Sequence, residues 1–325
     1  MRTQTAYCLA FCTSLFAVAI LQEHSGEGDR PKVTLDEVKE PLSAGDTPGK
    51  TFEPVQLIAD FRIARQALEE GHSGIYRYTS KENLDRLFDQ AEKNLNKPMG
   101  VVEFYRVLAP VVAAVKCGHT AVSLPRDFWK HSNANSGVLP LQVRVLEGKA
   151  YVWRDLSGAP VPLAGKEIRS INGVSTSKIV EKMLAAASGD GDVQTVRMRR
   201  ISGWAFSSQL TALVGLIGPY EVAFWDSQKQ REFKVQLTGA ELPRLQELAN
   251  AKFPQDQRPK NAAEFKLLDD GATAVMTIRG FDEFVDAKRQ KTMADFYQES
   301  FDAISQKRTK TLILDLRSNG GGRMS

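Results

Sequence analysis

The sequence predicts a multi-domain protein of mixed α+β and α/β class, and three patterns along the chain support this prediction. Apolar residues recur at helical spacing first, then alternate with polar residues, and finally form a strand, helix, strand succession. Domains usually hold roughly 100–200 residues, so a chain of 325 residues can hold two or three of them. The expected segments are a signal peptide (1–21), a linker (22–50), a helical domain (51–136), a β-rich module (137–240), a connector (241–261) and the start of a parallel-sheet α/β core (262–325).

The composition is typical of a soluble globular protein, with 42% hydrophobic and 25% charged residues. Lys and Arg total 43 against 39 for Asp and Glu, a formal net charge of +4, and the basic residues are spread along the chain. Nucleic-acid binding requires a concentrated basic footprint. The densest basic group, Arg197, Arg199 and Arg200, is short and is explained more simply as a solvated helix face. We therefore expect no nucleic-acid partner.

The first residues have the order of a secretory signal peptide: Arg2, an apolar run over about 7–21, and small residues at Ala17 and Ala19. The run is too short for a membrane span, which needs about 20 consecutive apolar residues. We therefore expect export to the periplasm or the extracellular space, with cleavage near Ala19 and no membrane span in the mature protein.

The cysteines are consistent with this prediction. Cys8 and Cys12 lie within the signal segment, and a lipid anchor on Cys12 is the competing interpretation, although Phe11 before it fits a lipid-attachment box poorly. After cleavage only Cys117 remains, so no internal disulfide is possible.

The helical domain begins with two amphipathic helices, and Thr79 with Glu82 suggests a capping box at the start of the second. A third helix contains Pro110, and Gly118 stands where a C-terminal cap glycine would. His119 is therefore expected just past a helix end. The apolar residues that indicate the first two helices are Leu57, Phe61, Ala64 and Leu68, then Leu84, Leu87, Phe88, Ala91 and Leu95.

From Leu139 the apolar period changes to two, and Glu147-Gly148 predicts a hairpin turn. A short strand then ends at Asn172-Gly173, and a helix follows over 179–184. This order resembles a PDZ-like module over about 137–238. No Gly-Leu-Gly-Phe-like carboxylate-binding loop is visible in it.

The last segment predicts a strand at 274–278, a helix, and a strand of the buried type at 312–316. Such a succession predicts a crossover in a mostly parallel sheet, and the final strand is of the kind buried on both faces. We expect the chain to end while this domain is only beginning, before the elements that would cover this strand, so its unpaired edge should be prone to aggregation.

The most informative motif is Asp315-Leu-Arg-Ser-Asn-Gly-Gly-Gly322, which follows that strand. A bare glycine triplet is often only a flexible turn. Directly after a buried strand, however, glycines leave backbone N–H groups free to face an anion.

This strand and loop resemble the tail-specific, or C-terminal processing, serine peptidase family. The resemblance implies that Gly320, Gly321 and Gly322 form an oxyanion loop. It also implies that Asp315, Arg317 and Asn319 brace this loop rather than react.

A second set of motifs resembles the tricorn-like branch of the same family, with elements at 72–78, 103–110 and 116–120. The resemblance implies that His119 in Gly-His-Thr is the general base, whereas a lone histidine at a helix end is more often a cap or part of the core. His24, His72 and His131 lack such a match and are expected to be structural or solvated.

Cys117 departs from the family pattern, in which an acidic residue often precedes Gly-His. The orientation of His119 is therefore expected to depend on an acid beyond residue 325, and Cys117 is expected to be a small buried thiol rather than a nucleophile.

No family nucleophile is found in the sequence. Ser325 is too close to the glycine loop, and no G-x-S-x-G elbow is present. No H-E-x-x-H or paired Cys-x-x-Cys indicates a metal site, and no cofactor is expected.

We therefore expect an exported serine-type peptidase that acts on polypeptides by acyl transfer, represented here by an inactive piece without its nucleophile. Two alternatives stay open. One is a non-catalytic peptide-binding protein that uses the PDZ-like module, and the other is a small-ligand binder, because the same core is similar to retinoid-binding repeats.

Overall fold

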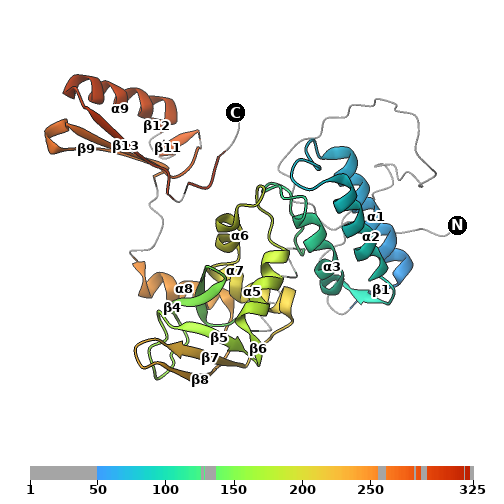
Figure 1. Cartoon of the computed structure of the whole chain (residues 1–325). Coiled ribbons are helices and arrows are strands. Elements are labelled where there is room, and N and C mark those ends of the chain that lie inside the picture. Colours follow the sequence, from blue (N-terminus) through green and yellow to red (C-terminus); the bar gives the residue numbers. More distant parts are fainter. Residues whose placement is uncertain are drawn as a thin grey trace, which may run out of the picture. The chain divides into compact units, whose positions relative to one another are not determined.

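The structure is a computed structural model in which the chain divides into two compact units, 1–251 and 252–325 (Figure 1). Within the described residues, no helix is both long and apolar enough to cross a membrane. The expected signal peptide, the linker up to residue 49, His24, His131 and Ser325 lie outside these residues. The structure describes residues 50–125, 128, 137–254, 261–281, 283–286, 291–317 and 319–322.

The first unit begins with three helices, as the spacing of apolar residues predicts. They are α1 (Pro54–Gly71), α2 (Lys81–Lys93) and α3 (Val101–Ala113), with β1 (Thr51–Phe52) paired antiparallel to β2 (Met99–Gly100). The apolar positions that set the helical spacing in α1 are buried. In α2, Leu84, Phe88 and Ala91 are buried, whereas Leu87 is exposed.

The start of α2 differs from the expected capping box by one residue. Ser80 is the N-cap, and its side chain accepts a hydrogen bond from the Asn83 N–H. The Thr79 hydroxyl instead donates to the Ala114 carbonyl at 2.6 Å, because it lies next to the end of α3. Thr79 therefore joins two helices rather than capping one.

The β-rich part is a six-stranded antiparallel sheet in the order β3-β4-β5-β7-β8, with β6 paired to β5. Its strands are β3 (Leu141–Leu146), β4 (Lys149–Asp155), β5 (Glu167–Ile171), β6 (Val174–Ser175), β7 (Tyr220–Asp226) and β8 (Arg231–Leu237). The hairpin turn at 147–148 and the Asn172-Gly173 turn both place two residues at positive φ, as expected.

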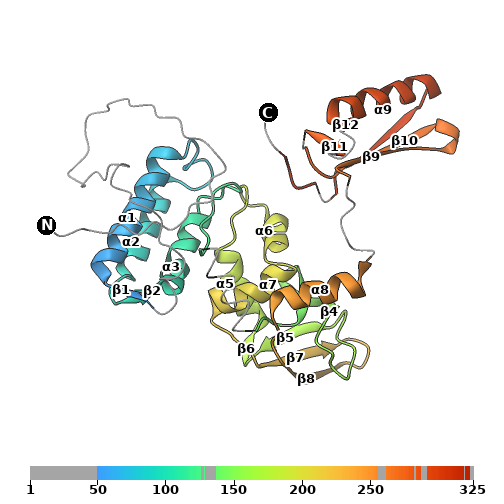
Figure 2. The ribbon, with the colours of Figure 1, turned by 180° about the vertical axis from the view of Figure 1, so that it is seen from behind.

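Helices cover one face of this sheet, and both views show them on the same side (Figures 1 and 2). The buried residues of α5, Ile179, Val180 and Met183, match the predicted helix at 179–184. The helices are α5 (Thr176–Ala185), α6 (Gln194–Arg200), α7 (Trp204–Gln209) and a π-helix, η3 (Leu210–Val214). Much of the expected connector at 241–261 is a further helix, α8 (Leu242–Lys252), because Leu245 and Ala249 bury one face of it.

The helical and β-rich parts share one hydrophobic core, which runs from Phe52 to Leu237. Arg106 on α3 joins them further, donating to the carbonyls of Ala212 at 2.6 Å and Thr211 at 3.0 Å. Burial lowers the pKa of the Arg106 guanidinium. The domain boundary expected at residue 136 therefore runs through a shared core, and this core holds the end of α3 in place relative to the loops around α5.

The second unit contains a three-stranded sheet in the order β13-β10-β9, and α9 contacts this sheet through β9 (Figure 2). Strands β10 and β13 are parallel, as expected, with Met276 opposite Leu314. Strand β9 is antiparallel to β10, which corrects the expected mostly parallel sheet. The reason is the short η5 turn between them, since a parallel pair needs a long crossover. The elements are β9 (Ala263–Leu268), η5 (Asp269–Gly271), β10 (Thr273–Ile278), β11 (Phe284–Asp286), β12 (Lys291–Thr292), α9 (Met293–Lys307) and β13 (Thr311–Asp315).

Strand β13 is of the type usually buried on both faces, and we expected it to have an unpaired edge here, which the structure confirms. It lies at one edge of the sheet, and the side chains of Leu312, Ile313 and Leu314 are 42%, 48% and 52% exposed. An apolar run such as Leu312–Leu314, with exposed faces and an open edge, is an aggregation hazard. The small buried cluster of this unit lies instead among β9, β10, β11 and α9.

Candidate active site

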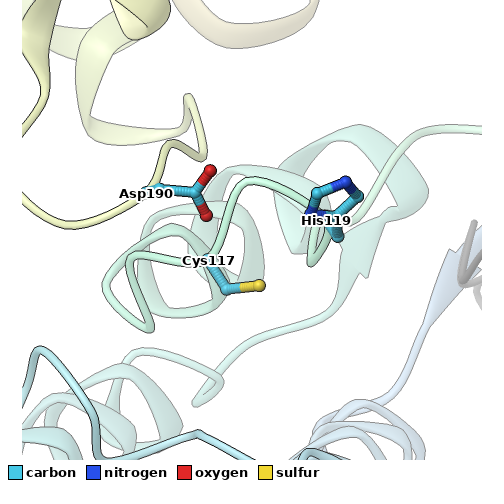
Figure 3. Close-up of side chains that lie close together, drawn as sticks. All are labelled: Cys117, His119 and Asp190. Atoms are coloured by element: carbon cyan, nitrogen blue, oxygen red, sulfur yellow. The ribbon is translucent and has the colours of Figure 1, made fainter. Parts of the chain in front are cut away.

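The loop that carries His119 follows α3 and brings three chemically reactive side chains together (Figure 3). The Cys117 sulfur, an imidazole nitrogen of His119 and a carboxylate oxygen of Asp190 all lie within 4.8 Å of one another. His119 and Asp190 are exposed, and Cys117 is partly buried. Cys117 is therefore a free thiol beside the histidine rather than the buried thiol that we expected.

Asp190 is the residue that sequence reasoning missed. It lies between α5 and α6, and its Oδ1 accepts a hydrogen bond from the Gly118 N–H at 2.7 Å. The two loops also meet where the Gly191 N–H donates to the Lys116 carbonyl at 2.9 Å. The fold places this acid near His119 from 71 positions further along the chain. The acid that we expected for His119 lies beyond residue 325, outside the described residues. The Gly-Asp-Gly-Asp stretch at 189–192 signals an exposed turn, and nothing in it points to His119.

Gly118 makes room for this contact rather than capping a helix. Helix α3 ends at Ala113 with Ala114 as its C-cap, so Gly118 is not the cap glycine that we expected. A Cβ on Gly118 would lie 2.8 Å from Asp190 Oδ2, closer than real side chains approach. The missing side chain therefore lets the carboxylate reach the backbone of the histidine loop.

Two of the three clustered arginines hold this site together, which corrects their expected role as a solvated helix face. Arg200 donates to the Gly118 carbonyl at 2.7 Å and to the Ser188 carbonyl at 2.9 Å. Arg197 donates to the carbonyl of Leu184, in the last turn of α5, and to the carbonyl of Ala187, just after this helix. Carbonyls at a helix end lack partners within the helix, so guanidinium donors satisfy them.

The remaining contact between the loops is buried. The Ser188 hydroxyl donates to the Thr120 carbonyl at 2.6 Å. The loop at 116–120 is thus tied to the 188–191 loop on both sides of His119, and the backbone below the imidazole is fixed by tertiary contacts.

His72 has a structural position, as expected. It is the C-cap of α1, and its Nδ1 accepts a hydrogen bond from the Gly74 N–H at 3.1 Å.

The glycine loop lies in the second unit, at the carboxyl end of β13. The Gly321 N–H donates to Asn319 Oδ1 at 2.8 Å, and Gly321 has a φ of +95°. A Cβ on Gly322 would lie 2.0 Å from the Phe281 carbonyl oxygen, whereas a Cβ on Gly320 would meet nothing within 4 Å. Because the Gly321 N–H already has a partner, Gly320 and Gly322 are the better candidates for donors to an oxyanion.

The three residues expected to brace this loop form one contact to a distant strand end and two contacts between near neighbours. Asn319 Nδ2 donates to the Ile278 carbonyl at 3.1 Å, which attaches the loop to the end of β10. Arg317 forms two side-chain hydrogen bonds to Asp315, at 2.9 and 2.7 Å. These bonds and the Arg317 N–H lower the pKa of Asp315 to about 2.

Each loop has the chemistry of one part of an acyl-transfer site. An imidazole can accept and return a proton near neutral pH. Backbone N–H groups that face outward from a glycine loop can stabilise an anion. The two loops belong to different units, so the geometry of each loop is established separately.

No family model and no curated protein matches this chain. Solved structures do match it. A crystal structure of mature CPAF is similar over 83% of this chain and 56% of its own, at 13% identity and a TM-score of 0.48. A crystal structure of a CPAF point mutant is similar over 83% of this chain and 57% of its own, at 11% identity and a TM-score of 0.50.

This chain therefore spans a little more than half of the CPAF chains that it matches. At such low identity the similarity concerns the fold. The chain accordingly has a multi-domain, mixed α+β fold similar to that of CPAF.

Proposed function

We propose that this chain is part of an exported serine-type peptidase that hydrolyses polypeptides by acyl transfer, with His119 as its general base. The observation that carries the proposal is the exposed imidazole of His119 beside the carboxylate of Asp190, on a loop held by contacts to Ser188 and Arg200. The similarity of the fold to that of CPAF, a serine protease, supports the proposal.

In this proposal His119 takes the proton of an attacking serine hydroxyl and returns it to the leaving amine. Asp190 stabilises the imidazolium that forms in between, because a nearby carboxylate favours the charged ring. Asp190 thus takes the place of the acid that we had expected beyond residue 325.

The glycine loop has the second role. The N–H groups of Gly320 and Gly322 stabilise the negative oxygen of the tetrahedral intermediate, and each such donor is typically worth about 2.7–4 kcal/mol. Gly321 shapes the loop through its bond to Asn319.

The nucleophilic serine is the part that the proposal assigns to sequence outside the 325 residues. The CPAF chains have regions that this chain does not match, since only 56–57% of their length is covered. The 325-residue chain alone is therefore proposed to be inactive, and the tricorn-like branch of the tail-specific peptidases remains the family that its motifs resemble.

The test compares His119→Gln with His72→Gln in the protein as its host produces it, using an unfolded protein as substrate. We expect His119→Gln to lower turnover by about 10²–10⁴, the usual contribution of a positioned acid–base group. His72→Gln should keep full turnover, because His72 lies at the C-cap of α1.

A serine-directed covalent probe, located by mass spectrometry, then identifies the nucleophile. Full activity of His119→Gln would refute the base assignment. If the host protein neither labels nor cleaves but binds peptides or small ligands, the non-catalytic alternative replaces the peptidase. Peptide cleavage by the 325-residue chain alone would refute the placement of the serine.

Export is a separate part of the proposal, and it rests on Arg2, the apolar run and the Ala17-x-Ala19 order. We expect the mature protein to begin near residue 20–25 and to lie in the periplasm or outside the cell. N-terminal sequencing by mass spectrometry of protein from the native host tests this. An intact Met1 on a cytoplasmic product would contradict it.

A further inference from the structure

We propose that Cys117, His119 and Asp190 form a zinc-binding site. Their ligand atoms, a thiol sulfur, an imidazole nitrogen and a carboxylate oxygen, lie within 4.8 Å of one another (Figure 3). The sequence alone indicates no metal site, because Cys117 and His119 are an isolated pair and Asp190 joins them only in the folded chain.

The ligand set selects zinc on chemical grounds. Zn²⁺ binds thiolate, imidazole and carboxylate at about 2.0–2.3 Å, so tetrahedral ligands are separated by roughly 3.3–3.5 Å. The three atoms thus need to approach one another by about 1 Å or somewhat more, which small rotations of the exposed His119 and Asp190 side chains supply. Thiolate and carboxylate together balance the charge of the ion, and the thiolate disfavours Mg²⁺ and Ca²⁺.

The backbone around these ligands is already fixed, so little order has to be created on binding. Asp190 Oδ1 accepts the Gly118 N–H at 2.7 Å, which orients the carboxylate while its second oxygen stays available. Arg200 holds the Gly118 carbonyl, and the Cys117 carbonyl accepts the Thr120 N–H at 3.1 Å. Such outer contacts orient first ligands and tune metal affinity.

Three protein ligands leave the fourth tetrahedral position of zinc open to water or to another ligand. If the proposed function holds, the ion also occupies the imidazole lone pair that a general base needs. Zinc would then inhibit the peptidase by occupying His119, and its removal would restore the base. This consequence rests on the proposed function, whereas the binding site does not.

The experiment is a titration of the purified 325-residue chain with Co²⁺, followed by competition with Zn²⁺. We expect one ion per chain, a sulfur-to-cobalt charge-transfer band, release of protons, and a rise in Tm, since the ion binds the native state. Cys117→Ser should abolish the charge-transfer band. Asp190→Asn should weaken binding by more than about tenfold, because loss of even an outer contact costs about 10–100-fold.

The substitution Asp190→Asn keeps an oxygen that can accept the Gly118 N–H, so the loop should retain its fold. The matched control is Asp192→Asn in the same loop. Asp192 is an exposed acid whose Oδ1 lies 2.6 Å from Lys116 Nζ. This variant should bind the metal as the unaltered chain does.

Absence of the charge-transfer band, or equal binding by Cys117→Ser, would overturn the site. Metal binding without any peptidase activity in the host protein would count against the proposed function alone.

Discussion

The two candidate loops of this protein are built in opposite ways. The histidine loop at 116–120 is held by residues that lie about 70–80 positions away in the sequence, namely Ser188, Asp190 and Arg200. The glycine loop at 319–322 is held mainly by neighbours, with Asn319 bonded to Gly321 and Asp315 to Arg317, and by one strip of backbone at 278–281. A loop that is held by its sequence neighbours can be recognised from the sequence as a motif. A loop that is held by distant residues cannot.

The difference extends to the cores below the loops. The first unit buries one large cluster that spans its helices and its sheet. The second unit has a small cluster and exposes the apolar side chains of β13. We therefore expect the first unit, which holds the histidine loop, to have a higher free energy of unfolding than the second unit.

The largest expected effect comes from a matched pair of leucines. Leu108 on α3 is fully buried, and Leu314 on β13 is 52% exposed. Leu108→Ala should destabilise the first unit by about 2–5 kcal/mol, whereas Leu314→Ala should cost the second unit less than about 1 kcal/mol. Urea unfolding, with hydrogen exchange read separately in each unit, measures both costs. Equal costs would show that β13 is covered in solution.

Next in size is a comparison of two adjacent glycines. Gly322→Ala places a methyl group against the Phe281 carbonyl, at a distance where no side chain fits, and should cost about 1–3 kcal/mol or more. Gly320→Ala enters open space and should be nearly neutral for stability. The readout is hydrogen exchange at the Phe281 amide, which donates to the Gly321 carbonyl at 2.9 Å. The proposed packing fails if both variants leave that amide equally protected.

A smaller effect is expected at the arginines of α6. Arg200→Ala removes the donors to the Gly118 and Ser188 carbonyls and should cost about 1–2 kcal/mol. Arg199→Ala, one position earlier on the same helix, serves as the control. Faster exchange at the Gly118 and Gly191 amides should appear in the first variant and not in the second. Identical exchange in both would mean that the histidine loop does not depend on Arg200.

The smallest effect concerns pH and the glycine loop. The pKa of Asp315 is lowered from 3.8 to about 2 by hydrogen bonds from Arg317. Because the folded pKa is depressed, the stabilising contact is complete above pH 4 and is lost as the pH falls toward 2. Arg317→Ala should return the pKa of Asp315 toward 3.8, as a carboxyl NMR titration would show. An unchanged pKa of Asp315 would show that Arg317 does not brace this loop through Asp315.

The sequence by itself determined the local features of this protein. Helical spacing predicted α1, α2 and α3, and the alternation from Leu139 with its Glu147-Gly148 turn predicted the β3–β4 hairpin. The Asn172-Gly173 turn was also predicted, because Asn and Gly are favoured at the two positive φ angles of such a turn. Each of these features depends on contacts among residues close together in the chain.

Tertiary structure alone decided what stands beside His119. Asp190 and Arg200 reach Gly118 only because α3 and the sheet share one core. The antiparallel pairing of β9 with β10 was likewise decided by the tertiary structure. Periodicity indicates which side of an element is apolar, but it does not indicate which distant element packs against that side. The chemistry of His119 depends on this packing, since the role of an imidazole is set by the groups around it.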